Sequence, residues 1–308
     1  MVIHDRSYSR WKGDRDGSVP GAAVILQAGL RRGVATLFRR KIPAVILILL
    51  AFGPFVFAFG FLLVRFYILT NIGQFPGPAS ALQDPEVAAV SQVSAENVYT
   101  YLFLVQWPFV MLACVLLGSG LVAEDKRANA LELYLSRPVT VRQYLLGKLG
   151  TIAIFIAAVT LVPTLVLTVE QLALTWGDFP EMGRLLLMML RTMAACAIWI
   201  AVPSLLIVAA SSLTAKARNA AILWMAVIVM LEFVASNILL EIFGDDRFHL
   251  LQIGWNIRQV GAWILGDSSA DHLLATVPVW ASALVLACWI AACVRIMTTR
   301  VKPVEVVA

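Results

Sequence analysis

Few side chains of this 308-residue chain have the types that catalysis requires, and they are not arranged as an active site. The three histidines, His4, His249 and His272, are not part of an HExxH zinc motif. Asp267 and Asp271 lie near His272 and have the ligand types of a cation site, but the charges of a solvated loop explain them more simply. We therefore predict no metal site.

The candidate nucleophiles lie in apolar surroundings. Ser119 stands between Gly118 and Gly120, as an intramembrane serine nucleophile would, but small residues also let membrane helices approach closely, and packing is favoured. The four cysteines lie in apolar runs without CxxC spacing and are predicted to be packing residues. They are Cys114, Cys196, Cys288 and Cys293. We predict no catalytic residue, which makes a membrane-embedded enzyme the least favoured function class.

Gly147 and Lys148 resemble the end of a phosphate-binding P-loop but do not complete one. That loop has the pattern GxxxxGK[ST], in which glycines let backbone N–H groups approach the phosphates. Here Leu149 follows the lysine, and Arg142 stands where the first glycine is needed. The chain is therefore predicted not to hydrolyse ATP by this route and to bind no cofactor.

Two ionisable residues, Arg191 and Glu232, lie deepest in apolar sequence. Each costs a few kcal/mol or more if it is isolated in a membrane. Counted from the outer ends of their apolar runs, they lie roughly 9 and 12 Å deep at the helical rise. The similar depths predict an Arg191–Glu232 ion pair, with Glu170 near the same level. A structural clamp is favoured over a lining of the transport path.

The composition identifies the kind of protein that must position these groups. Hydrophobic residues make up 60% and charged residues 14% of the chain, against about 25% charged in globular domains. The mean hydropathy is +0.85, which predicts an all-α polytopic protein of the lipid bilayer. The net charge of +5 comes from short basic clusters beside apolar runs, so no nucleic-acid partner is expected.

Six apolar stretches reach the length of about 20 residues that a membrane-spanning helix needs. They lie near 43–69, 101–123, 149–173, 185–210, 219–240 and 275–297. The sequence thus predicts a single transmembrane domain of six helices over 21–300, preceded by a mobile tail over 1–20 and followed by a tail over 301–308.

Lysine and arginine residues concentrate on one side of these spans. The segments 124–148 and 211–219 and both tails are basic, whereas the loop over 70–100 contains neither lysine nor arginine. Because basic loops stay in the cytoplasm, both termini are predicted to be cytoplasmic, in a multi-pass protein of the plasma membrane.

Two further segments are predicted to lie at the membrane surfaces. Residues 21–41 combine apolar positions with basic pairs, which is typical of an amphipathic interfacial helix on the cytoplasmic side. The outer segment 241–274 becomes apolar again, and Trp255 and Trp263 suggest a partly inserted segment before the sixth span. A tryptophan-bearing helix packed on the bundle is an equal alternative.

The charged stretch 124–148 interrupts the second and third spans. The second helix is expected to continue to Ser136, with Asp125, Asn129 and Glu132 on its polar face. The product would be a helix–corner–helix below the membrane, continuous with two spanning helices, so that a push on it would tilt both.

Local signals define the corner of this stretch. The first helix is predicted to end at Arg137, because Pro138 disfavours helical backbone in the preceding residue. Thr140 is predicted as the N-cap of the next helix, and Gln143, three residues later, completes a capping box.

These residues resemble the first cytoplasmic loop of ABC-2 type transporter permeases. The resemblance consists of Glu124, the Leu-Glu-Leu of 131–133, the Leu-Ser-Arg-Pro-Val of 135–139 and the Tyr-Leu-Leu-Gly-Lys of 144–148. In that family a glutamate precedes a Gly-Thr-Leu-Glu segment, a Ser-x-Pro-Val corner and a Gly-Lys that opens the third span. The chain departs from the pattern at 129–130, where Asn-Ala replaces Gly-Thr.

The resemblance implies the membrane-spanning permease subunit of an ATP-binding cassette transporter, expected to be an exporter. A separate ATPase, which would hold ATP and Mg²⁺, is expected to dock on 124–148 through Glu124, Glu132, Arg137 and Pro138. Charges that only solvate the loop and set topology are the other interpretation of these positions. The subunit would form a homodimer or pair with a sister permease.

The short loop over 211–219 is expected to give the ATPase a second contact. The alternative function is a secondary transporter or channel without an ATPase partner. That class would show ion-coupling carboxylates near mid-membrane or an internal repeat, and neither is clear in this sequence.

Overall fold

Helices make up all the regular secondary structure in the described part of the chain, which a computed structural model gives for residues 21–39, 41–71, 95–130, 139–175, 179–266 and 277–301. In chain order they are α1 (Gly21–Arg39), α2 (Lys41–Asn71), α5 (Ala95–Ala113), the π-helix η2 (Cys114–Gly118), α6 (Gly120–Arg127), α8 (Val141–Leu174), α9 (Phe179–Leu213), α10 (Ala217–Val229), the π-helix η3 (Met230–Leu239), α11 (Leu240–Phe243), the 3-10 helix η4 (Asp246–Leu251), α12 (Ile253–Leu265) and α14 (Val279–Arg300). The tails predicted over 1–20 and 301–308 lie outside the described residues, except for Val301.

Five helical segments among the described residues are long and apolar enough to cross a membrane. They are Asn97–Arg127, Val141–Leu174, Met182–Leu213, Ala217–Val234 and Val279–Arg300. The predicted all-α polytopic class is thereby confirmed. The helix α2 coincides with the first predicted span near 43–69. Its described side chains include the apolar stretch Phe52–Ile68, and the count of six spans stays a prediction.

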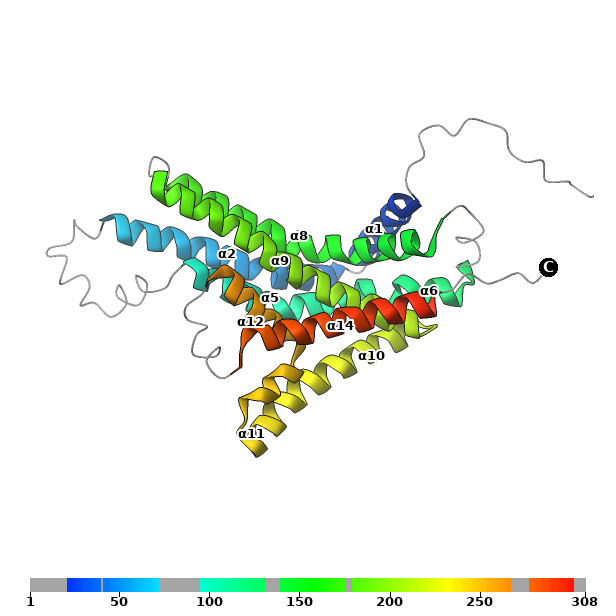
Figure 1. Cartoon of the computed structure of the whole chain (residues 1–308). Coiled ribbons are helices and arrows are strands. Elements are labelled where there is room, and N and C mark those ends of the chain that lie inside the picture. Colours follow the sequence, from blue (N-terminus) through cyan, green and yellow to red (C-terminus); the bar gives the residue numbers. More distant parts are fainter. Residues whose placement is uncertain are drawn as a thin grey trace, which may run out of the picture.

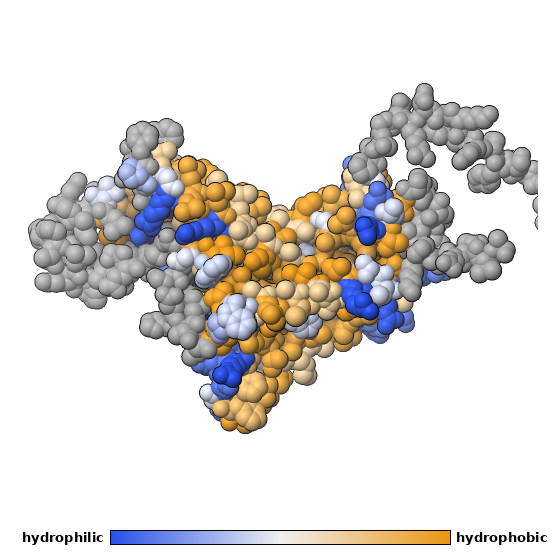
Figure 2. Space-filling view, viewed as in Figure 1, coloured by the Kyte–Doolittle hydropathy of each residue, from blue (hydrophilic) through white to orange (hydrophobic). Residues whose placement is uncertain are grey.

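The hydrophobicity of the molecular surface changes along the direction of the long helices. Figure 1 shows α5, α8, α9 and α14 running in the same general direction, while the segment from α10 to α11 leans away from them. In the same view, hydrophobic residues cover the middle and hydrophilic residues gather towards the ends (Figure 2). This is the distribution expected where the middle faces lipid chains and the ends face headgroups and water.

Aromatic side chains fill the interior between α5 and α9. Trp199 of α9 stacks on Phe103 of α5 with ring centroids 5.4 Å apart. It also meets the edge of Trp107, again at 5.4 Å and with an interplanar angle of 82°. Such paired rings are more stabilising than their buried area alone, so the second and fourth predicted spans are held firmly together.

Glycines allow α1 to lie directly against α8. A side chain at Gly29 would collide with Thr151, and a Cβ at Gly147 would lie 2.9 Å from the backbone oxygen of Ala22. The predicted amphipathic helix is therefore present as α1, and it crosses α8 near the end of the bundle where α6 lies (Figure 1). The glycine before Lys148 is explained by this close approach of two backbones.

The apolar part of the outer segment forms α12, which packs within the bundle. Eight of its residues, among them Ile257 and Gln259, are buried. Trp255 stacks on His249 with ring centroids 4.9 Å apart, whereas Trp263 remains 63% exposed. These contacts favour the helix packed on the bundle, and its partial insertion into the membrane stays a prediction.

Candidate functional site

The predicted docking stretch is described only at its two ends. Glu124 is exposed on α6, whereas Glu132, Arg137 and Pro138 lie outside the described residues. The docking role of all four residues therefore stays a prediction. The candidate site is the structure that holds the two ends of this stretch in place.

The far end of the stretch begins as the sequence predicts. The hydroxyl oxygen of Thr140 accepts a hydrogen bond from the backbone N–H of Gln143 at 3.2 Å. In return, the Gln143 side-chain oxygen accepts one from the Thr140 backbone N–H at 3.1 Å. This is the predicted capping box, and it fixes the start of α8 at Val141.

The near end of the stretch differs from the prediction. The helix was expected to continue to Ser136, but α6 ends at Arg127 and a turn follows. Asn129 has φ 50° and so adopts the left-handed conformation, which asparagine tolerates better than most residues other than glycine. Asn129 stands where the resembling family favours glycine, so asparagine can meet the same backbone requirement.

This conformation gives the first prediction. The substitution Asn129→Val should lower the free energy of unfolding by about 1–2 kcal/mol, because a β-branched side chain is strained in the left-handed region. Asn129→Gly should be tolerated. The measurement is denaturant unfolding of the purified protein in micelles. Ala128→Val is the matched control, since Ala128 has φ −88°. Equal stability of the two valine variants would contradict the assignment.

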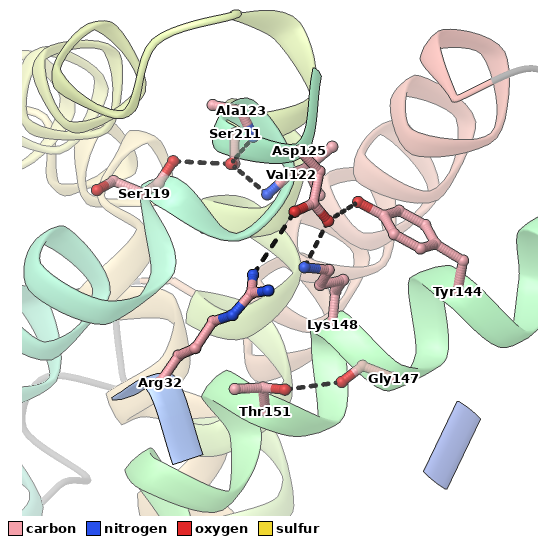
Figure 3. A network of polar contacts seen from close by, with 10 residues as sticks. All are labelled: Arg32, Ser119, Val122, Ala123, Asp125, Tyr144, Gly147, Lys148, Thr151 and Ser211. Atoms are coloured by element: carbon pink, nitrogen blue, oxygen red, sulfur yellow. Dashed lines mark hydrogen bonds and ion pairs between the residues drawn. The ribbon is translucent and has the colours of Figure 1, made fainter. Parts of the chain in front are cut away.

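Between these two ends lies a group of polar residues that we call the Asp125 cluster: Arg32, Asp125, Tyr144 and Lys148 (Figure 3). Lys148 Nζ lies 2.6 Å from Asp125 Oδ2, and the Tyr144 hydroxyl donates to the same oxygen at 2.8 Å. Arg32 Nη1 approaches Asp125 Oδ1 at 4.0 Å. The cluster thus joins α6 to α8 and reaches α1.

Because most of the cluster is buried, breaking it costs more free energy than breaking an ion pair on the surface. Asp125 is 4% exposed and Lys148 5%, and Lys148 Nζ also lies 5.5 Å from the centre of the Tyr144 ring. A buried carboxylate is tolerated only when it is paired and hydrogen-bonded. The sequence placed Asp125 on a polar face with Asn129 and Glu132, and the structure adds that Asp125 is buried against partners on α8. The four-residue spacing of Tyr144 and Lys148, which puts both on one face of α8, was the signal that could have revealed the partners.

A second set of contacts, which we call the Ser211 bridge, joins α6 to the end of α9. The Ser211 hydroxyl accepts from the backbone N–H groups of Val122 and Ala123, both at 3.0 Å, and donates to the Ser119 carbonyl at 2.7 Å (Figure 3). These backbone groups lie just past the π-helix η2, where the Ser119 N–H bonds to the Cys114 carbonyl instead of the usual fourth residue back. Ser211 therefore satisfies groups at the interruption in the helical hydrogen-bond ladder.

Lys126 adds a further link on the same side of α6. Its ammonium group donates to the backbone carbonyl of Ser212, within the loop over 211–219. The structure therefore brings together the two segments that the sequence predicts as contacts of an ATPase. The end of α6 is held by α8 on one side and by the last turn of α9 on the other.

The two predicted intramembrane charges do not form an ion pair with each other. Glu232 accepts a hydrogen bond from the backbone N–H of Gly254, at the N-terminus of α12. Arg191 is exposed and lies beside Gly266, the C-cap of the same helix. Twelve residues of helix, or about 18 Å, separate the two ends. Each charge lies at the helix end where the macrodipole favours its sign. The predicted Arg191–Glu232 ion pair was therefore wrong.

Glu170, expected near the same level, is buried in α8. Neither of its carboxylate oxygens has a hydrogen-bond partner in the described part of the chain. The structure therefore does not make it part of the Asp125 cluster or of the Ser211 bridge.

A sequence model of the ABC-2 family transporter proteins matches residues 38–300, which include α2 through α14 and both ends of the docking stretch. No curated protein matches the chain.

Proposed function

Because the chain belongs to the ABC-2 family of transporter proteins, we propose that it works as the membrane-spanning permease subunit of an ABC transporter in which a separate ATPase docks on residues 124–148. The observation that carries this proposal is the attachment of both ends of that stretch to spanning helices. The Asp125 cluster ties α6 to α8, and the Ser211 bridge ties α6 to α9.

These attachments give a route for mechanical work. A force on the stretch is passed at one end to the helical segment Asn97–Arg127 and at the other to Val141–Leu174. The buried contacts make the two ends move together, because separating them would leave Asp125 or the backbone groups at Ser211 without partners. Closure of an ATPase against this surface would therefore tilt the spans as a unit.

The further parts of the proposal follow from topology and family. The basic side of the membrane, which carries 124–148 and 211–219, is assigned to the cytoplasm together with both termini. ATP and Mg²⁺ would be bound by the ATPase and not by this chain. We also propose that the transporter is a plasma-membrane exporter and that the subunit pairs with a second copy or with a sister permease.

Co-purification tests the docking surface. The permease would be co-expressed with a candidate P-loop ATPase from the same organism, and captured through a tag on the permease. Glu132→Lys and Arg137→Glu should each reduce the captured ATPase by about 30-fold or more, the effect of losing an interface hot spot worth about 2 kcal/mol. Glu241→Lys is the matched control, because Glu241 is exposed on α11, far along the chain from the stretch.

The outcomes separate two explanations. Full capture of the ATPase by both variants would remove the docking role from these residues. Failure of the unaltered permease to capture any ATPase, together with transport that does not need ATP, would favour the secondary transporter or channel.

A further inference from the structure

A cavity of about 150 Å³ lies between α1, α6 and α8, beside the Asp125 cluster. Its lining includes Arg32 from α1, Glu124 and Asp125 from α6, and Lys148 from α8. At about 30 Å³ per water molecule, the volume corresponds to about five waters or to one small polar group. The cavity reaches the surface beside α1, because Arg32 and Glu124 of its lining are exposed.

The four charged residues in the described lining of this cavity form one buried pair and one exposed pair, each with opposite charges. Asp125 and Lys148 are both buried and neutralise one another at 2.6 Å. The other two charged residues in the described lining, Arg32 and Glu124, are exposed and opposite in sign. A ligand that enters from the surface therefore meets one cation and one anion.

Both of these side chains are directed towards the cavity. Arg32 extends from α1 until its guanidinium is 4.0 Å from Asp125 Oδ1, although 70% of its side chain is exposed (Figure 3). Glu124 lies back along its own helix, because a Cβ placed on Gly120 would be only 3.0 Å from its carboxyl carbon. The glycine one helical turn earlier thus leaves room for this carboxylate on the membrane side of α6.

The uncharged part of the lining contains three hydroxyl residues, Thr36, Ser119 and Thr151, and an apolar part that continues into the membrane-spanning region. The apolar part includes Leu116, Leu121 and Phe155. Leu116 is 41% exposed and lies eleven residues, or about 16 Å, before the end of the span at Arg127. One end of the cavity is therefore suited to a charged group and the other to hydrocarbon.

We propose that this cavity binds the headgroup of a phospholipid that carries a primary ammonium group, of the phosphatidylethanolamine class. The lipid phosphate pairs with Arg32, and the ammonium donates hydrogen bonds to the Glu124 carboxylate. The glycerol and the first chain carbons lie along Leu116 and Phe155. An anionic headgroup fits less well, because it would lie beside Glu124 with Lys148 already paired.

The experiment measures lipid binding to the purified full-length subunit. Short-chain phosphatidylethanolamine, phosphatidylcholine and phosphatidylglycerol are titrated into the protein in detergent, and bound lipid is counted by native mass spectrometry. Phosphatidylethanolamine should bind about tenfold more tightly than either of the others, and Arg32→Gln and Glu124→Gln should each remove about a tenfold factor. Arg31→Gln is the matched control, because Arg31 is exposed on α1 but does not line the cavity.

A second variant tests the cavity without altering its charges. Thr36 lines the cavity and is exposed, so Thr36→Trp should fill the space and abolish tight binding while Arg32 and Glu124 remain. Glycerophosphoethanolamine, which lacks acyl chains, should bind far more weakly than the lipid. The proposal would be overturned if phosphatidylglycerol or phosphatidylcholine bound as tightly, if the Thr36 variant kept its binding, or if the chain-free compound bound as well as the lipid.

Discussion

Replacing Lys148 with methionine is expected to lower the free energy of unfolding by about 3–5 kcal/mol, which is the typical cost of leaving one member of a buried ion pair without its partner. Asp125 would keep the hydrogen bond from Tyr144 at 2.8 Å, but the remaining cation, Arg32, is 4.0 Å from the other carboxylate oxygen and mostly exposed to solvent. One neutral hydroxyl does not compensate a carboxylate that is 4% exposed.

The measurement is denaturant unfolding in micelles, compared with Arg142→Met as a control. Arg142 is an exposed cation on the same helix, one turn and a half before Lys148, and its removal should change stability by less than about 1 kcal/mol. The double variant Asp125→Asn with Lys148→Met should regain most of the lost stability, because both charges are removed together. A single variant as stable as the control would show that the pair is not buried in the folded protein.

The same double variant separates stability from function. It keeps the fold but lacks the ionic link between α6 and α8. If the proposed function is right, its complex with the ATPase should form, while transport driven by ATP should fall. Undiminished ATP-driven transport would show that the Asp125 cluster serves stability alone.

The second large effect is expected from Ser211→Ala. The substitution removes one hydroxyl that satisfies the backbone N–H groups of Val122 and Ala123 and the carbonyl of Ser119. Val122 is the third residue of α6, so its N–H has no acceptor within the helix. Leaving this buried group unsatisfied should lower the free energy of unfolding by about 1–3 kcal/mol. Ser211→Thr, which keeps a hydroxyl, should be less destabilising.

The adjacent serine is the natural control for this prediction. The Ser212 hydroxyl is also buried, but it donates a local hydrogen bond to the Ala209 carbonyl at 2.7 Å, three residues earlier in the same helix. Ser212→Ala should therefore cost less than about 1.5 kcal/mol. Equal losses in the two alanine variants, measured by the same unfolding experiment, would rule out a special role for the Ser211 bridge.

Features that depend on neighbouring residues were predictable from the sequence. The capping box at Thr140 and Gln143 needs only a hydroxyl and an amide three residues apart, and the structure contains both of its hydrogen bonds. The spanning helices follow from the length of apolar runs in the same way. Their boundaries were less accurate at α6, where the conformation of Asn129 ends the helix earlier than apolar periodicity suggests.

The sequence did not predict which way a side chain faces around its helix axis, or which residue from a distant part of the chain it meets. Residue counts gave Arg191 and Glu232 similar depths, but a count along a helix axis contains no information about which neighbour each side chain faces. The helix α12, which packs against α9 and contacts η3, provides separate ends for the two charges. Asp125 is likewise paired with Lys148, 23 positions later in the sequence, and the pattern of its own helix contains no information about that partner.

The π-helix η2 sets the rotation of the second half of the second span, about the helix axis, relative to the first half. A π turn holds one residue more than an α turn, and each residue turns an α-helix by about 100°. With the extra residue at Cys114–Gly118, everything after it is rotated by about that angle relative to an uninterrupted helix. Asp125 faces Lys148 only in the rotated phase. A related chain that lacked the extra residue of η2 would keep its apolar run and its aspartate. Its carboxylate, however, would point away from α8 and could not join the cluster. The number of residues before the aspartate therefore matters for the cluster as much as the aspartate itself.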